Sequence, residues 1–500
     1  MTSIRSKMAS GAAWMVLFKT LDRSLGLVST VILARVLVPA DFGLVAMATS
    51  LIAILELFSA FGVDVALIQR PNAVREHFDT AWTLNGLAGV TVACAMLVFA
   101  WPLSWFYNEP RLVAMVCVLA IGSVLQGWEN IGVVAFRKEM NFQREFRYLM
   151  IKRFIAFCIG VTLALVLRNY WALVISMIAG RAVGVTLSYY LHPYRPKLSL
   201  AAATEFLHFS KWLVVQNMLF FLRERAPDFI LGKVSGPHAV GIMNVSTEIA
   251  SMPGTELIAP INRAALPGYS KLRDDPAALR REYLAVASLV TLVVTPVVAG
   301  IGVVASIVVA LLLGPKWHEA AIIINLMAFL GITNVFLGTA HAPLLAMGRP
   351  SVFAKITAIQ VSVLIPVLII MSSRYGVVGA ATGYILTALG LLPLNIALVL
   401  RTIEMRAATL LREVWRPILA AGTMYVVTKL VAMPVIDIAT LSSSEALRLL
   451  AIYVPLGALV YVATLASLWM LSGRPEGAET IVMRIVAERL RHVHALLSRQ

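Results

Sequence analysis

Long apolar runs follow one another along almost the whole of this chain. A helix that crosses a lipid bilayer needs about 20 consecutive apolar residues, and these runs are continuous rather than alternating, which favours helices over the strands of a barrel. The sequence therefore predicts an all-α, polytopic integral membrane protein. We expect about 14 spanning helices, at residues 10–36, 41–67, 79–105, 112–136, 148–167, 170–191, 206–232, 238–266, 284–313, 318–346, 352–373, 376–400, 413–432 and 447–472.

The composition leaves no room for a large soluble domain. Apolar residues make up 60% of the 500 residues and charged residues 14%, whereas about 25% of the residues of a soluble domain are charged. The sequence contains no nucleotide-binding glycine loop, no zinc-protease motif and no nucleophile elbow. The three cysteines lie inside apolar runs without metal-ligand spacing. We therefore expect no enzyme, no metal site and no cofactor.

The basic residues indicate how the spans are oriented. The net charge is +16, and most Lys and Arg residues fall in alternate loops, including those from 137 to 153. Because short cytoplasmic loops carry the excess of positive charge, we expect both termini in the cytoplasm. No loop interleaves basic and aromatic residues over a surface long enough for a nucleic acid, so we expect no nucleic-acid partner.

The C-terminal tail, residues 474–500, has its own pattern. Apolar residues from Ile481 to Leu497 recur at helical spacing with arginines between them. This pattern is typical of an amphipathic helix that lies on the cytoplasmic membrane surface. A short helix that packs on the protein itself would have the same pattern, and the sequence does not separate the two.

An internal repeat divides the chain into lobes. Residues 32–43 and 230–241 both read I-L-x-[R/K]-V-x-x-P-x-x-x-G, and both join the first helix of a group of six to the second. Such duplication is common in transporters. We predict an N-terminal lobe at 1–191, a linker at 192–205, a C-terminal lobe at 206–400, two additional helices at 401–473 and the tail.

Ionisable residues recur within the predicted spans, mainly in the first two helices of each lobe. Such a residue costs about 2.5–3.5 kcal/mol on insertion scales, so it usually faces a partner or a wet path. Guanidinium groups suit a pyrophosphate or an acidic sugar, and carboxylates in low dielectric bind protons more readily. We predict a polar path between the lobes, with headgroup binding by Lys19, Arg23, Lys211, Arg223, Arg225 and Arg263, and coupling or gating by Asp22, Glu56, Asp64, Asp228, Glu248 and Glu256.

Local pairing is the alternative interpretation of these charges. Lys19 and Asp22, and likewise Arg225 and Asp228, are three residues apart and could pair on one helix face. This alternative does not explain why the third, fourth, ninth, twelfth and fourteenth predicted helices carry almost no charge between their ends.

Eight short segments resemble those of one transporter family in their order and spacing, at 32–43, 61–62, 66–70, 136–142, 209–212, 228–232, 314–317 and 344–350. Through these segments the chain resembles the Wzx-type polysaccharide and O-antigen flippases of the multidrug/oligosaccharidyl-lipid/polysaccharide (MOP) exporter superfamily, which also contains the MATE transporters. The resemblance implies alternating access, an H⁺ or Na⁺ gradient as the driving force, and flipping of an undecaprenyl-pyrophosphate-linked oligosaccharide across the bacterial inner membrane for lipopolysaccharide or exopolysaccharide synthesis. It also implies contacts with membrane lipids, a polysaccharide polymerase and export machinery.

Two other transport functions remain open on the sequence. A MATE-type drug or cation antiporter and a peptidoglycan lipid II flippase belong to the same superfamily. A membrane glycosyltransferase or polymerase would need a large outer loop for its catalytic site, and no outer loop here is long enough. Neighbouring genes for glycosyltransferases would favour the polysaccharide flippase.

Overall fold

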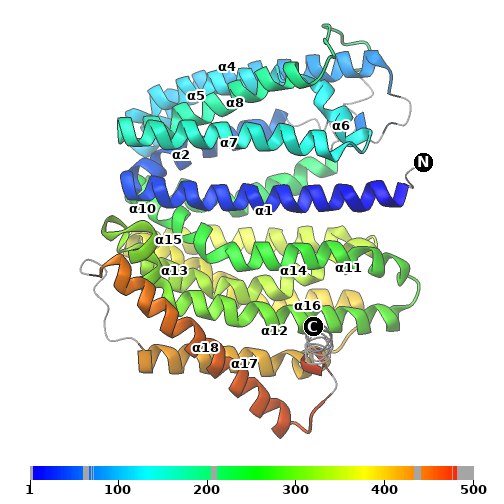
Figure 1. Ribbon diagram of the computed structural model, residues 1–500, viewed down its shortest axis with the longest axis vertical. Coiled ribbons are helices and arrows are strands. Elements are labelled where there is room, and N and C mark those ends of the chain that lie inside the picture. The colour runs from blue at the N-terminus through cyan, green and yellow to red at the C-terminus, as the bar shows by residue number, and fades with distance from the viewer. Residues whose placement is uncertain are drawn as a thin grey trace, which may run out of the picture. The chain divides into compact units, whose positions relative to one another are not determined.

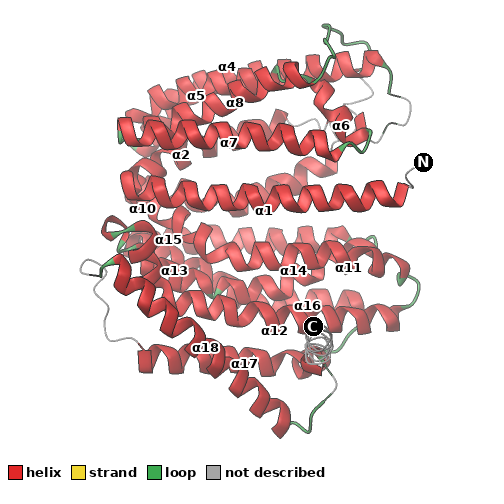
Figure 2. Cartoon of the chain, in the orientation of Figure 1, coloured by secondary structure: helices red, strands yellow, loops and turns green. Residues whose placement is uncertain are grey.

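The computed structural model describes residues 4–59, 63, 67, 68, 70, 73–203, 211–432, 441–475 and 477–480. These residues form helices joined by short turns, with no strand among them (Figure 2). Eight of the described helices are long and apolar enough to cross a membrane, or nine when the bent pair at residues 111–127 and 131–138 counts as one span. The predicted all-α class is confirmed, and the number of about 14 spans stays a prediction.

The helices fall into two compact units, residues 1–241 and residues 242–500. In the first unit α7 packs along α1 and α8, and α5 packs along α4 and α8 (Figure 1). The helices of this unit are α1 (Ile4–Val36), α2 (Pro39–Ser59), α4 (Arg75–Tyr107), α5 (Arg111–Gly127), α6 (Val134–Lys138), α7 (Phe142–Leu167), α8 (Trp171–Leu191) and the first part of α10 (Lys211–Pro253).

Glycines allow α4 and α5 to approach closely. A Cβ atom on Gly89 would lie 2.6 Å from the carbonyl oxygen of Ser123, and one on Gly127 would lie 2.6 Å from that of Asn85. Lipid tails are as apolar as the side chains, so helices in a membrane associate through close packing rather than through the hydrophobic effect. The two glycines therefore allow α4 and α5 to pack with their backbones close together.

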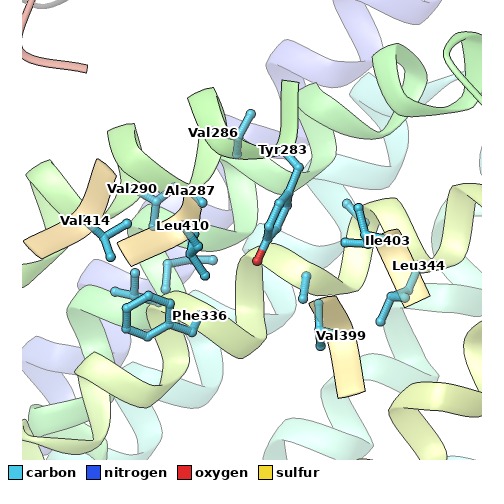
Figure 3. Packing of buried hydrophobic residues seen from close by; sticks show 14 of the residues in the cluster. Tyr283, Val286, Ala287, Val290, Phe336, Leu344, Val399, Ile403, Leu410 and Val414 are labelled. Atoms are coloured by element: carbon cyan, nitrogen blue, oxygen red, sulfur yellow. The ribbon is translucent and has the colours of Figure 1, made fainter. Parts of the chain in front are cut away.

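The second unit has its own apolar core. Tyr283 of α12 is fully buried and packs with Phe336 of α14, Val399 of α16 and Leu410 of α17 (Figure 3). The elements of this unit are the last part of α10, a π-helical turn at 254–258, α11 (Ala259–Lys271), α12 (Pro276–Val308), a π-helical turn at 309–313, a 3₁₀ turn at 315–317, α13 (Ala320–Ala328), α14 (Leu330–Ala346), α15 (Pro350–Gly390), α16 (Leu392–Ile403), α17 (Ala407–Ala432) and α18 (Ser443–Leu471).

Two glycines interrupt the longest helices. Gly236 in α10 has φ 76° and Gly376 in α15 has φ 59°, so the backbone leaves the helical region at both positions. A residue with a Cβ atom adopts such positive φ angles only at a cost, which explains the choice of glycine. Gly236 lies between the predicted spans 206–232 and 238–266, and Gly376 is the first residue of the predicted span 376–400, just after the predicted span 352–373.

A polar break also divides the predicted span 112–136. Helix α5 ends at Gly127, and the chain turns by 59° before the segment 131–138. The Asn130 side chain accepts a hydrogen bond from the Gly132 N–H (2.9 Å) and donates to the carbonyl of Tyr194 (2.7 Å). The sequence predicted one continuous helix here because the apolar pattern does not reveal a buried capping residue.

Residues 192–203 of the predicted linker lie along the start of α4 as an ordered strap. The Tyr194 hydroxyl and the Lys197 N–H both donate to Asp79 Oδ1, at 2.6 and 2.8 Å. Burial raises the pKa of Tyr194, and its hydrogen bond to Asp79 acts in the same direction, so this hydroxyl keeps its proton and remains a donor. This part of the linker is therefore fixed to the first unit.

The beginning of the predicted tail is anchored to the second unit. Arg416 of α17 and Glu479 form an ion pair with Nε to Oε1 at 2.8 Å, and each side chain is 5% exposed. A buried pair of this kind is costly to break because one partner would keep an uncompensated charge. Residues 481–500, which carry the predicted amphipathic pattern, lie outside the described residues.

Candidate functional site

A charged pair inside the first unit joins α2 to α8. Arg181 Nη2 lies 3.5 Å from Glu56 Oε1, and Arg181 Nη1 donates to Ser123 Oγ of α5 at 3.4 Å. The Arg181 side chain is 19% exposed and that of Glu56 is 41% exposed. Glu56 is one of the predicted coupling residues, whereas its partner was not predicted. The pair places a guanidinium group next to a carboxylate within two apolar helices.

A second pair joins α1 to α7. Arg153 Nε lies 2.8 Å from Asp22 Oδ1, and both side chains are partly exposed. Gly26 lies one turn further along α1, where a Cβ atom would come 3.1 Å from the Arg153 guanidinium. The glycine therefore leaves room for the arginine. Asp22 has its ion pair with a neighbouring helix, not with Lys19 on its own helix.

A third carboxylate, Asp228 of α10, is buried to 4% exposure. Its Oδ2 atom accepts hydrogen bonds from Ser50 Oγ of α2 at 3.0 Å and from Arg225 Nη1 at 3.2 Å. Arg225 and Asp228 are three residues apart on one helix, as expected if the intramembrane charges pair locally. One turn earlier, Arg223 pairs with Glu224 at 2.9 Å. Both predicted arginines of this segment therefore contact carboxylates of the same helix.

Another charged group lies at the break after α5. Lys152 Nζ of α7 lies 3.0 Å from Glu129 Oε2, and the Tyr148 hydroxyl donates to Glu129 Oε1. Tyr148 is also 3.3 Å from the carbonyl of Gly184 on α8. A Cβ atom on Gly184 would come 2.6 Å from Lys152 Cε. This group connects the break to α7 and α8, and none of its members is among the predicted site residues.

The other predicted site residues are dispersed. Lys19 is exposed and Arg23 half-buried on α1. Glu248, Glu256 and Arg263 belong to the second unit, where Glu248 is half-buried and the other two are exposed. Asp64 lies outside the described residues, as does the side chain of Lys211. Among the described residues, no three His, Cys, Asp or Glu side chains could together hold a metal ion.

The two copies of the sequence repeat contact each other within the first unit. A Cβ atom on Gly43 would lie 1.7 Å from the carbonyl oxygen of Pro237, and one on Gly241 would lie 1.8 Å from that of Pro39. Each glycine follows the proline of its own copy by one helical turn. The repeat therefore forms a reciprocal crossing in which backbone touches backbone, and we call these four residues the glycine crossing.

Arg181 is the residue that the sequence could have revealed. It is the one charged residue in the apolar run 171–191, and a charge in such a run usually has a functional or paired role. Arg153 is less conspicuous in the sequence because it directly follows a loop that is rich in basic residues. Helix α7 begins at Phe142, so Arg153 lies three turns inside the helix.

Comparison with known proteins identifies the family of this chain. A family model described as "Polysaccharide biosynthesis protein" matches residues 32–322. The chain is 26% identical over 394 residues to the lipopolysaccharide biosynthesis protein WzxC of Escherichia coli (strain K12), and the match covers 77% of this chain and 79% of that relative.

Two solved structures show the same fold. The lipid II flippase MurJ in an inward closed conformation has a TM-score of 0.71 at 12% identity, covering 91% of this chain and 98% of that one. An inward-facing MATE transporter of the MOP superfamily has a TM-score of 0.61 at 14% identity, covering 77% of this chain and 94% of that one. The resemblance to this superfamily is confirmed. The protein is a multi-pass membrane protein that belongs to the polysaccharide biosynthesis protein family and has the fold of the MOP transporters.

Proposed function

We propose that this protein flips an undecaprenyl-pyrophosphate-linked oligosaccharide repeat unit across the bacterial inner membrane, for the synthesis of lipopolysaccharide or exopolysaccharide. The observation that carries the proposal is the position of Arg153 and Arg181 inside apolar helices, each next to a carboxylate. Guanidinium groups bind phosphate oxygens in pairs and are weakly hydrated, so they suit a pyrophosphate that leaves water. The relative named for lipopolysaccharide biosynthesis supports a saccharide substrate.

Movement by alternating access requires a point about which helices can turn. The glycine crossing suits this role because Gly43 and Gly241 bring two helix starts into contact without intervening side chains. A contact made by backbone atoms keeps its place while the helices tilt around it. We therefore assign the crossing the role of a pivot.

An H⁺ or Na⁺ gradient is the proposed driving force. Carboxylates in a low-dielectric environment gain affinity for protons and cations. Glu56, Asp228 and Glu248 are the candidate coupling residues, and Glu56 and Asp228 each contact an arginine that a substrate anion would attract. Both termini are proposed to lie in the cytoplasm. A polysaccharide polymerase and the export machinery are the proposed partners that receive the flipped unit.

A lipid II flippase is the second candidate function. It is favoured by the superposition on MurJ, which covers almost the whole of both chains. Both substrates share a polyprenyl pyrophosphate, so the paired arginines suit either one. The two candidate functions differ in the sugar of the substrate and in the polymer that a cell without the transporter fails to make.

Deletion of the gene tests the choice between these functions. We expect the deletion strain to lose its surface polysaccharide and to accumulate the lipid-linked repeat unit on the inner leaflet, with normal peptidoglycan. Expression of the wild-type chain from a plasmid restores the polymer. Unchanged polysaccharide in the deletion strain, together with rescue of cells depleted of their lipid II flippase, would favour the second candidate instead.

A further inference from the structure

We propose that Arg181 is a specificity residue that exchanges its carboxylate partner Glu56 for the pyrophosphate of the lipid-linked substrate. This inference rests on the proposed function and names the group that selects the anionic headgroup. Arg181 was not among the predicted headgroup-binding residues, which lie in the first two helices of each lobe. The proposal adds α8 to the helices that contact the substrate.

The contact between Arg181 and Glu56 is longer than the contacts of two other arginine–carboxylate pairs that join different helices or segments among the described residues. It measures 3.5 Å, whereas Arg153 and Asp22 approach to 2.8 Å and Arg416 and Glu479 also to 2.8 Å. Charge-assisted hydrogen bonds are normally about 2.7–2.9 Å long. A carboxylate held at the longer distance is the easier one for another anion to replace.

The surroundings hold Arg181 in place without using all of its donors. A guanidinium group has five N–H donors. Among the described residues, its polar contacts are Glu56 Oε1 and Ser123 Oγ, at 3.5 and 3.4 Å. Gly122 lies against the side chain, where a Cβ atom would come 3.1 Å from Arg181 Cδ. The stem is therefore packed, while the guanidinium can still accept a bidentate partner.

The exposed fractions of the two side chains indicate which partner leaves the pair when the substrate binds. The Arg181 side chain is 19% exposed, whereas that of Glu56 is 41% exposed. The more exposed carboxylate can therefore leave the guanidinium group and be solvated when a pyrophosphate takes its place. A pyrophosphate offers several oxygens to the fork of the guanidinium, whereas Glu56 contacts it at one atom. When pyrophosphate replaces Glu56, the Arg181 guanidinium group therefore makes more hydrogen bonds and still has an anionic partner.

Binding of undecaprenyl pyrophosphate to the purified full-length protein in lipid nanodiscs tests the proposal. We expect Arg181→Gln to weaken binding about tenfold or more, which corresponds to about 1.4 kcal/mol. Glu56→Gln removes the competing carboxylate and is expected to tighten binding. Arg181→Lys keeps the charge but not the fork, so its affinity should fall between those of wild type and Arg181→Gln. Thermal unfolding of each variant reports whether it is folded.

A charge exchange separates binding from structure. The double variant Glu56→Arg/Arg181→Glu keeps an ion pair between α2 and α8, so we expect wild-type thermal stability with loss of binding. The matched control is Glu129→Lys/Lys152→Glu, a pair of similar exposure in the same unit, which should keep its affinity. The proposal would be overturned if the Glu56→Arg/Arg181→Glu variant or Arg181→Gln bound the probe with wild-type affinity. It would also be overturned if the control variant lost as much affinity as the Glu56→Arg/Arg181→Glu variant. If the wild-type protein itself does not bind the probe, the proposed function fails.

Discussion

Replacement of Gly43 or Gly241 by alanine is expected to abolish polysaccharide export and to destabilise the folded protein. In either variant the new methyl group would lie less than 2 Å from a proline carbonyl oxygen of the other repeat copy. Because backbone atoms cannot rotate away as a side chain can, the helix starts must separate. Overpacking of this kind costs about 1–3 kcal/mol, or more where the backbone cannot move. Surface polymer in complemented deletion cells and thermal unfolding in detergent measure the two effects.

Gly422 provides the matched control. It lies inside α17, and a Cβ atom added there meets no heavy atom within 4 Å. Alanine is favoured over glycine in helix interiors by about 1 kcal/mol, so Gly422→Ala should export normally and unfold at the same or a higher temperature. Normal export by Gly43→Ala and Gly241→Ala would show that the glycine crossing does not need its close contact.

Replacement of Arg225 by alanine is expected to abolish export while the protein still inserts into the membrane. Asp228 is buried and would lose the guanidinium that lies 3.2 Å from it. Breaking a fully buried pair costs about 3–5 kcal/mol, but Arg225 is 37% exposed, so we expect a smaller loss of stability. Arg23→Ala, on α1, is likewise expected to block export. Membrane fractions assayed for protein, and cells assayed for polymer, separate insertion from transport.

A second substitution separates the effect of an unpaired Asp228 charge on stability from the effect of losing Arg225 on transport. The double variant Arg225→Ala/Asp228→Asn removes the uncompensated charge, so its thermal stability should recover while export stays absent. Arg111→Ala is the matched control, because Arg111 pairs with Glu109 in the exposed turn between α4 and α5. Export at the wild-type level by Arg225→Ala would remove this residue from the transport path.

The fold could be predicted where it depends on local sequence. The helices follow from apolar runs, and the breaks at Gly236 and Gly376 lie where the sequence separates two spans. The break at Asn130 could not be predicted, because its cap depends on the carbonyl of Tyr194, which is distant in sequence. The repeat was visible as a pattern, but only the structure shows that its two glycines face each other's prolines.

The candidate site could be predicted where partners lie on one helix. Arg225 and Asp228 are three residues apart, and their pairing follows from helix geometry. Glu56 and Arg181 are joined by the packing of α2 against neighbours of α8, which a single sequence does not specify. The prediction found the carboxylate because a lone charge in an apolar run is conspicuous. The arginine lies on α8, outside the leading helices of each lobe in which the intramembrane charges concentrate.

Reconstitution measures directly whether this chain moves a pyrophosphate-linked saccharide from one leaflet to the other. Purified protein is incorporated into liposomes that contain fluorescently labelled undecaprenyl-pyrophosphate oligosaccharide in both leaflets, and a membrane-impermeant quencher is added outside. We expect the label of the inner leaflet to become accessible to the quencher in liposomes with wild-type protein, and we expect Arg181→Gln and Gly43→Ala to slow this loss of fluorescence. The measurement is repeated under an imposed H⁺ or Na⁺ gradient of either direction. If quenching with wild-type protein stops at the outer-leaflet fraction under all of these conditions, as in empty liposomes, the result contradicts transport of this substrate by the chain.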